Sequence, residues 1–345
     1  MLLGVHTLVR EFCRSKIEEK EWNEYLKDAS SFYMNHSGNI PEEYKSLPMV
    51  LEEVDAAELL MEACEYEEAT DIIAGVTELL DRWGLGRFRE SLYIRILPHV
   101  EGLAKAGLLH NLGILYQDRG EYEKALVQYQ KSLKIKEELG NRAGVSISLH
   151  QIGMIHQYRG DYEEALVQYQ KSLKIKEELG DRAGVAISLH QIGMIYQERG
   201  EYKEALVQYQ KSLKIEEELG NRVGVALSLH QIGMIHQVRG EYEEALVQYQ
   251  KSLKIKEELG DRSGVASSLH QIARIHQERG EFSEAFKLFV SALKILAELG
   301  SPDEKIALNN LIKLRQQWGA DLFDAAWLEQ IGTELPEIFK NESIK

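Results

Sequence analysis

The chain has 345 residues, of which 44% are hydrophobic and 28% are charged, which is ordinary for a globular protein. Its net charge is −15, and residues 1–100 alone hold 10 Lys and Arg against 20 Asp and Glu, so no basic stripe favours nucleic acid or an anionic membrane as a partner. Cys13 and Cys64 form no disulfide or metal pattern, the first residues lack the features of a signal peptide, and no run is long enough to span a membrane, so we expect a cytoplasmic protein.

The first hundred residues predict an irregular set of helices. Residues 22–34 have the periodicity of an amphipathic helix, and a further helix is expected at about residues 88–97. Residues 65–84 match the second helix of the repeats described next, because the spacing from Ala69 to Gly84 equals that from Ala125 to Gly140. We therefore expect a degenerate repeat within residues 1–100.

Residues 101–300 consist of five units of 40 residues, which we number as repeats 1 to 5 (101–140, 141–180, 181–220, 221–260 and 261–300). Repeats 2 and 3 differ at only seven of 40 positions. A repeat of this length is one supersecondary unit that cannot bury its apolar face alone, so neighbouring units must stack.

Each repeat predicts two helices, helix A at about residues 142–158 and helix B at about 162–179 in repeat 2. Gly180 is placed to end helix B in a left-handed conformation, and Asn141 or its equivalent Asp181 is placed to cap the next helix A. The small residues Gly153 and Ala165 would allow the two backbones to approach closely. The fold class that follows is all-α, built from antiparallel helix pairs.

This pattern resembles the tetratricopeptide repeat, and the residues that carry the resemblance in repeat 2 are Leu149, Ile152, Gly153, His156, Gly160, Tyr162, Ala165 and Tyr169. The usual tryptophan at the first position and the proline that usually ends helix B are absent, and the period is 40 rather than 34. The linker at residues 178–186 is similar to that of Pins-type adaptors and kinesin light chains. The resemblance implies a right-handed superhelical solenoid whose concave side is lined by helix A.

Residues 6–12, with the sequence HTLVREF, resemble the closing segment of the winged-helix domain in STAND-type (NB-ARC-like) signalling ATPases. In that family such a segment leads into a helical array. The resemblance implies that residues 1–14 are the end of a winged helix and that the chain is the C-terminal sensor region of such an ATPase. The alternative is an ordinary amphipathic first helix.

Residues 301–345 predict helices that close the array, with Trp318, Phe323 and Trp327 covering the last apolar face. On helix B, Lys171, Lys174 and Lys176 lie among glutamates and predict an outer face laced with salt bridges.

No phosphate-binding loop, nucleophile elbow or zinc-ligand spacing occurs, so we expect no catalytic residues, no cofactor, no metal and no enzyme activity. The histidines offer no metal site by spacing. His150 and His156 point to different faces of one helix, and copies in successive repeats should be separated by 8–10 Å between neighbouring helix axes, which is too far for shared ligation.

The stripe of helix A opposite its core residues is the candidate partner-binding groove. It begins at Ile147 in repeat 2 and carries imidazole and amide groups that can pair with a peptide backbone, together with adaptable methionines. Gln157, Gln197 and Gln237 are expected not to be needed for packing between helices A and B. The candidate residues are His150, Gln151, Met154, Gln157, Tyr158, His190, Gln191, Met194, Gln197, Glu198, His230, Gln231, Met234, Gln237, Val238, His270, Gln271 and Arg274.

Position 158 and its equivalents vary most among the repeats and are candidates for specificity. The alternative is that these columns are only the product of recent duplication. The functional expectation is a protein- or peptide-binding scaffold, with the sensor module of a STAND-type ATPase as the first hypothesis. A free-standing adaptor and a self-associating array are the alternatives, and the ligand and the oligomeric state are left open.

Overall fold

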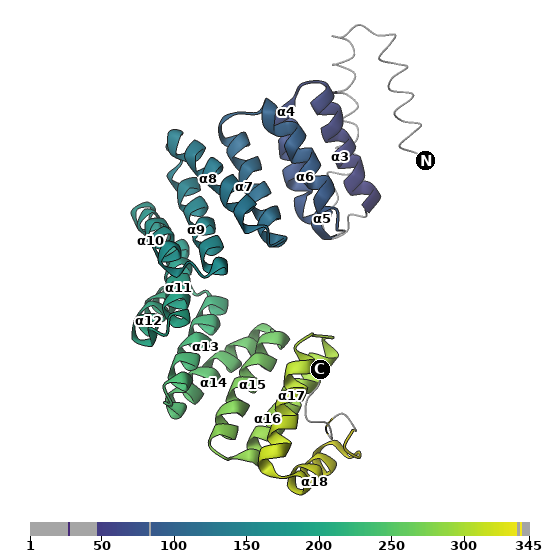
Figure 1. Cartoon of the computed structure of the whole chain (residues 1–345), viewed down its shortest axis with the longest axis vertical. Helices are drawn as coiled ribbons and strands as arrows, with labels where there is room; N and C mark the ends of the chain where they lie inside the picture. The colour runs from purple at the N-terminus through teal and green to yellow at the C-terminus, as the bar shows by residue number, and fades with distance from the viewer. Residues whose placement is uncertain (1–26, 28–46, 83, 337–338, 340–345) are drawn as a thin grey trace. The chain divides into compact units, whose positions relative to one another are not determined.

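A computed structural model describes residue 27, residues 47–82, residues 84–336 and residue 339. Within these residues every regular element is helical, which confirms the all-α fold class (Figure 1). The chain divides into two compact halves, Met1–Gln168 and Tyr169–Lys345, which are described separately. The proposed end of a winged helix at residues 1–14 and the helix expected at 22–34 lie outside the described residues.

The N-terminal half opens with helices that do not follow the 40-residue period. They are α3 (Leu47–Glu62), α4 (Tyr66–Gly75), α5 (Thr77–Arg82), α6 (Gly86–Ile96) and the short 3₁₀ helix η2 (Leu97–His99). Sequence matching predicted one helix over residues 65–84, but the structure breaks it at Val76, where the α4 C-cap residue leaves helical geometry. Ala69 is nevertheless fully buried, as Ala125 is in repeat 1, so the core contact of the degenerate repeat is kept.

Repeats 1 and 2 follow as regular helix pairs. Their helices are α7 (Gly102–Asp118), α8 (Tyr122–Glu138), α9 (Arg142–Arg159) and α10 (Tyr162–Leu179), the last of which crosses the boundary between the halves. The predicted limits of helices A and B are thus correct to within a residue. In each half, helix A of a repeat packs on its own helix B, and helix B packs on the next helix A.

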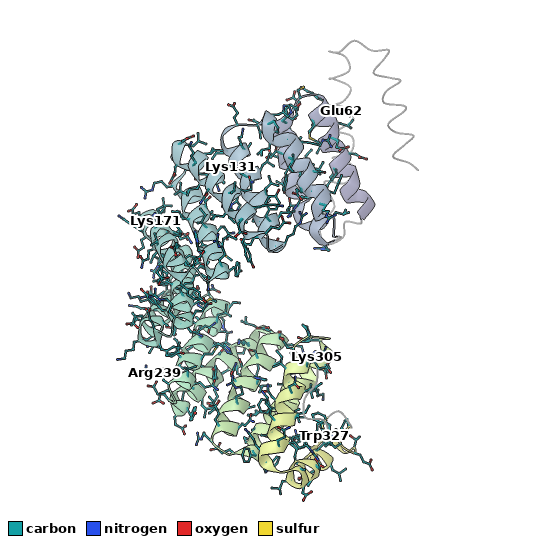
Figure 2. The ribbon with its side chains drawn as sticks, in the orientation of Figure 1. Glu62, Lys131, Lys171, Arg239, Lys305 and Trp327 are labelled. Atoms are coloured by element: carbon teal, nitrogen blue, oxygen red, sulfur yellow. The ribbon has the colours of Figure 1, made fainter. Side chains whose placement is uncertain are left out.

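The C-terminal half contains repeats 3 to 5 and two closing helices. Its helices are α11 (Arg182–Glu198), α12 (Tyr202–Leu219), α13 (Arg222–Val238), α14 (Tyr242–Leu259), α15 (Arg262–Glu278), α16 (Phe282–Glu298), α17 (Glu304–Trp318) and α18 (Ala320–Ile331). Phe286 of α16 packs against Phe323 and Trp327 of α18 (labelled in Figure 2), and Phe339 lies on the same cluster. These aromatic side chains cover the apolar side of repeat 5.

The turns have the chemistry that the sequence predicted. Gly180 has a φ of 71°, a conformation that favours glycine, and Asp181 accepts a hydrogen bond from the backbone N–H of Gly184 at 2.9 Å. Inside each pair, the close approach occurs at the helix A glycine: a Cβ on Gly233 would lie 2.9 Å from the ring of Tyr249 on α14. The tight pairing therefore requires glycine there, or alanine with a neighbouring ring that differs, as in repeat 5, where Ala273 faces Phe289.

Candidate functional site

The exposed stripe of helix A is well defined in the C-terminal half, and we call it the helix A face. In each repeat it begins with an exposed residue and continues through half-buried side chains to the last turn. Ile187 and Leu227 are 49% and 50% exposed, and Val238 is 59% exposed. The members of this face on α11, α13 and α15 are Ile187, His190, Gln191, Met194, Glu198, Leu227, His230, Gln231, Met234, Val238, Ser267, His270, Gln271, Arg274 and Glu278.

The N-terminal half presents the same stripe on α9, where Ile147 and Tyr158 are exposed and His150, Gln151 and Met154 are half-buried. The ring of Tyr158 stacks on that of Tyr122, the first residue of α8, with 5.7 Å between ring centroids. The variable position 158 is therefore next to an aromatic ring of the preceding repeat.

The glutamines at the end of helix A have a structural role that the sequence analysis missed. Tyr209 donates a hydrogen bond from its hydroxyl to Gln197 Oε1, and Tyr249 does the same to Gln237 Oε1, both at 2.9 Å. Gln237 is only 9% exposed. The expectation that these glutamines take no part in the packing of helices A and B was wrong, because the buried tyrosine of helix B needs an acceptor for its hydroxyl and the glutamine supplies it.

The histidines of the helix A face are largely buried and are held neutral. Burial, with a smaller contribution from Lys256, lowers the pKa of His230 to about 4, and burial also lowers the pKa of His190. The His230 ring lies beside the ring of Tyr249, with 5.2 Å between centroids. These imidazoles therefore present neutral hydrogen-bonding groups at neutral pH.

Side chains of successive helices A touch each other at the end of the array. Asn310 Nδ2 on α17 donates to His270 Nε2 on α15 at 3.1 Å, and Gln277 Nε2 donates to Gln317 Oε1 at 2.6 Å. The expectation that equivalent side chains are too far apart to share a ligand rested on the distance between helix axes and ignored the length of the side chains. Among the described residues, no group of three or more His, Cys, Asp or Glu side chains is placed to hold a metal ion.

The lysines of helix B lie in two places: some are exposed at the surface, and one is buried at the junction with the next repeat. Lys171 and Lys174 are exposed, as predicted (Lys171 is labelled in Figure 2). Lys176 is buried instead, and its Nζ donates to Ser188 Oγ of the next repeat at 3.0 Å. Lys136 and Lys256 make the same bond to Ser148 and Ser268. At 100° per residue Lys176 falls on the stripe of the buried Ser172, so periodicity could have separated it from Lys171 and Lys174. Only the structure shows that its long side chain reaches the neighbouring repeat.

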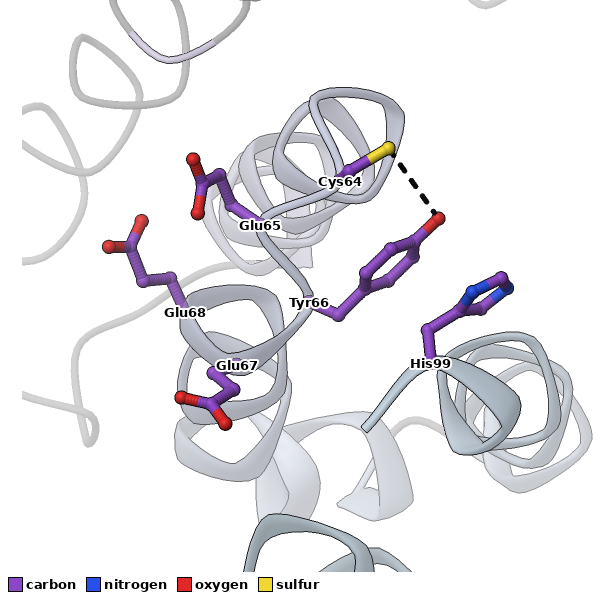
Figure 3. A pocket seen from close by; sticks show the side chains of 6 residues that line it. All are labelled: Cys64, Glu65, Tyr66, Glu67, Glu68 and His99. Carbon is purple, nitrogen blue, oxygen red and sulfur yellow. Dashed lines mark hydrogen bonds between the residues drawn. The ribbon is translucent and has the colours of Figure 1, made fainter. Parts of the chain in front are cut away.

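A pocket on the N-terminal half is separate from the helix A face (Figure 3). It is lined by Cys64, Glu65, Tyr66, Glu67, Glu68 and His99. The Tyr66 ring stacks on the His99 ring with 4.2 Å between centroids, and its hydroxyl lies 4.0 Å from Cys64 Sγ. The pocket holds one thiol, one imidazole and carboxylates without the spacing that a metal ion requires.

The solved structures with the same fold that are compared next are 17–20% identical to this chain in sequence. The STAND protein with a tetratricopeptide repeat sensor, PH0952 from Pyrococcus horikoshii, has a TM-score of 0.65 at 19% identity; the alignment covers 96% of this chain and 54% of that protein. The apo form of RapI has a TM-score of 0.58 at 20% identity, with 77% of this chain and 95% of RapI covered. BtubC from P. vanneervenii gives 0.51 at 17% identity, covering 71% and 93%. These likenesses show the fold.

No curated relative matches the chain. In the part that the structure describes, no helix is both long and apolar enough to cross a membrane. The family model of the tetratricopeptide repeat matches residues 104–178, 144–218 and 224–298, which together make up more than half of the sequence. The helix pairs, their glycine contacts and this match agree: the chain belongs to the tetratricopeptide repeat family, whose members are helical scaffolds for protein interaction.

Proposed function

We propose that the helix A face binds a peptide segment of another protein and that the chain is the ligand-sensing module of a STAND-type signalling ATPase. The observation that carries the binding proposal is the pair of exposed apolar side chains in consecutive repeats, Ile187 on α11 and Leu227 on α13, each on the same stripe of its helix as a half-buried methionine two turns further on. An exposed apolar row rimmed by amide and imidazole groups suits a peptide that brings both apolar side chains and a polar backbone.

The sensor role is supported by the likeness to the STAND protein with a tetratricopeptide repeat sensor, which extends over 96% of this chain. The chain spans about half of that protein. The sequence HTLVREF near the start resembles the end of the domain that precedes such an array in that family. A nucleotide-binding region encoded directly upstream of Met1 would agree with this role, whereas an unrelated reading frame there would contradict it.

The binding face is tested by two variants with equal changes on different faces. Peptides are first selected from a display library against the whole chain, and the affinity of a selected peptide is measured by fluorescence anisotropy. We expect Ile187→Asp with Leu227→Asp to weaken binding about tenfold or more, because two apolar contacts are replaced by charges.

The matched control is Val207→Asp with Val247→Asp on helix B, where both valines are 46% exposed. Each pair should change the free energy of unfolding by less than about 0.5 kcal/mol per substitution, which circular dichroism melts would check. Loss of binding in the helix B variant, with binding retained in the helix A variant, would place the site on the other face.

A further inference from the structure

The junction between repeats 3 and 4 holds a buried carboxyl group where the three other junctions between repeats hold a lysine ammonium. Lys136, Lys176 and Lys256 each donate from Nζ to a serine of the next repeat at 3.0 Å. On α12 the equivalent position is Glu216, and the equivalent serine on α13 is Ser228. The two helices follow one another in the C-terminal half (Figure 1), and both side chains are buried, with exposed fractions of 5% and 1%.

This carboxyl group has no partner among the described residues. Glu216 makes no ion pair and no side-chain hydrogen bond there, and its Oε2 atom is buried. The last turn of α12 also lacks a basic residue, whereas α8, α10 and α14 each have the lysine in that turn. The C-terminal end of a helix carries a partial negative charge, which adds to that of the carboxylate. Because a buried charge without a partner is costly, this point of the junction favours a cation.

The lengths of the side chains leave room for one ion between the carboxylate and the serine. A Cβ on Gly264 would lie 2.9 Å from Lys256 Cδ. At the equivalent place, a Cβ on Gly224 would lie 2.4 Å from Glu216 Cδ. The two Cδ atoms therefore lie against the same glycine of the next helix A. Lysine continues for two more atoms to reach its serine, but glutamate continues for only one. The carboxylate oxygens thus end one atom short of the position from which the ammonium nitrogen bonds to the serine hydroxyl.

We propose that a monovalent cation of the class of Na⁺, K⁺ and NH₄⁺ binds at the α12–α13 junction between the Glu216 carboxylate and the Ser228 hydroxyl. The ion takes the place of the lysine ammonium of the other junctions. A third oxygen lies beside the same glycine, because Asn221 Oδ1 accepts a hydrogen bond from the Gly224 N–H at 3.2 Å. Oxygen ligands suit these hard cations, and one carboxylate balances one positive charge.

This inference is independent of the proposed function, because it concerns a junction between repeats and not the helix A face. It departs from the expectation of no metal, which rested on the spacing of His, Cys and acidic residues in the sequence. The bound ion stabilises the closed junction by mass action. In a repeat array the effect should stay close to α12 and α13.

The test measures amide hydrogen exchange of the whole chain at equal ionic strength in KCl, NaCl, NH₄Cl and tetramethylammonium chloride. The tetramethylammonium ion is too large for the place of one ammonium nitrogen. At about 0.15 M salt, we expect amides of α12 and α13 to exchange at least about threefold more slowly with a small cation, which corresponds to a dissociation constant of about 75 mM or tighter. Amides of repeats 1 and 5 should exchange equally in all four salts.

Variants at the junction separate the ion from a general salt effect. Glu216→Gln removes the charge at almost the same size, and Glu216→Lys supplies an ammonium of its own, so both should exchange equally in all four salts. Ser228→Ala should reduce the difference between the small and the large cations. The matched control is Glu217→Gln, which changes an exposed carboxylate on the next position of α12 and should keep the full difference.

Crystals grown in RbCl provide a direct measurement. An anomalous peak of rubidium is expected between Glu216 and Ser228, and a peak there without anomalous signal would show a water molecule and overturn the inference. Equal exchange of α12 and α13 in the unaltered chain with small and large cations would also overturn it. The same holds if Glu216→Gln keeps the difference between the salts, since the carboxylate would then not be the ligand.

Discussion

Two junctions in the C-terminal half, α14–α15 and α12–α13, have almost the same sequence but carry opposite charges at two positions. In both, helix B of one repeat packs on helix A of the next. At the α14–α15 junction Lys256 donates a buried hydrogen bond to Ser268 at 3.0 Å, and Glu243 pairs with Arg279 at 2.7 Å. At the α12–α13 junction the positions of Lys256 and Glu243 are taken by Glu216 and Lys203.

The exchanged residues leave the α12–α13 junction with fewer bonds. Glu216 is 5% exposed, and its Oε2 atom is buried without a hydrogen-bond partner among the described residues. Its carboxyl group instead lies against Gly224, so close that a Cβ there would be 2.4 Å from Glu216 Cδ. Since Lys203 takes the position of Glu243, Arg239 lacks the carboxylate that Arg279 has across the junction. Arg239 keeps the pair with Glu241 in its own turn at 2.7 Å, as Arg279 keeps the pair with Glu281 at 2.9 Å.

Helix B nevertheless packs on the next helix A to a similar extent at both junctions. The hydrogen bonds and glycine contacts that join helix A to helix B within a repeat are unchanged: Ser212 bonds to the carbonyl of Ala186, and Ser252 to that of Ala226. A buried charged group contributes less net stability than its bonds suggest, because removing it from water costs much of what the bonds return. The comparison indicates that apolar stacking holds the array together and that charges adjust the strength of each junction.

The largest effect is expected from making the α14–α15 junction resemble the other one by Lys256→Glu. This change removes the bond to Ser268 and places a second carboxylate near Asp261, which now interacts favourably with Lys256. We expect the free energy of unfolding to fall by about 2–4 kcal/mol. Urea melts would measure it, with Lys256→Gln as a control that removes the positive charge and the Nζ donor without adding a carboxylate. A loss below about 0.5 kcal/mol would mean that the charge at this position does not matter.

Low pH should destabilise the packing around α13 more than the packing around α15. The folded-state pKa of His230 is about 4, below the ordinary value of 6.5, so the unfolded chain binds the proton more tightly. Stability is therefore fully present above pH 6.5 and is lost as pH falls toward 4, by on the order of 1–2 kcal/mol after allowance for partial exposure.

The control for this pH dependence is the neighbouring histidine. Replacement His230→Gln should flatten the change in stability between pH 6.5 and 4. Replacement His270→Gln should flatten it less, because burial and Arg274 lower the pKa of His270 while Asp303 opposes this lowering. Thermal melts at several pH values would measure both, and equal slopes in the two variants would remove this difference between α13 and α15.

The reverse exchange, Glu216→Lys, should strengthen the α12–α13 junction. A lysine there would have Ser228, buried and equivalent to Ser268, as its hydrogen-bond acceptor. We expect a gain of about 0.5–1.5 kcal/mol, the net value of one buried hydrogen bond. Hydrogen exchange should show slower exchange at α12 and α13 first, since a repeat array transmits such changes only to near neighbours. A destabilised variant would show that the carboxylate of Glu216 has a stabilising contact of its own.

The smallest effect is expected for Lys203→Glu, which would give Arg239 a carboxylate across the junction, as Arg279 has in Glu243. The side chains at this turn are partly exposed, so the gain should be below about 1 kcal/mol and should vanish in high salt. Thermal melts at two salt concentrations would measure it. Combined with Glu216→Lys, the two gains should add, because the substitutions lie at opposite ends of α12.

Much of the fold could be predicted from the sequence because its signals are local. The 40-residue period, the glycines between helices and the Asn or Asp caps each act within a few residues of the chain, so helices α9 and α10 were placed almost to the residue. The exposed part of the candidate face, such as Ile187 and Leu227, was equally predictable, because one turn of a helix sets which residues share a side.

Only the tertiary structure decided which neighbouring helix each long polar side chain contacts. Helix periodicity puts Lys176 on the same stripe as the buried Ala165 and Ser172. It does not show that Lys176 reaches Ser188 of the next repeat, or that Gln237 accepts a bond from Tyr249 of its own helix B. The break at Val76 and the contact between Asn310 and His270 likewise depend on packing against other helices. The sequence alone determined the repeat, the helices and their caps, because those depend on backbone conformation and short-range spacing. The partners of buried polar groups depend on distances between helices, which periodicity within one helix does not contain.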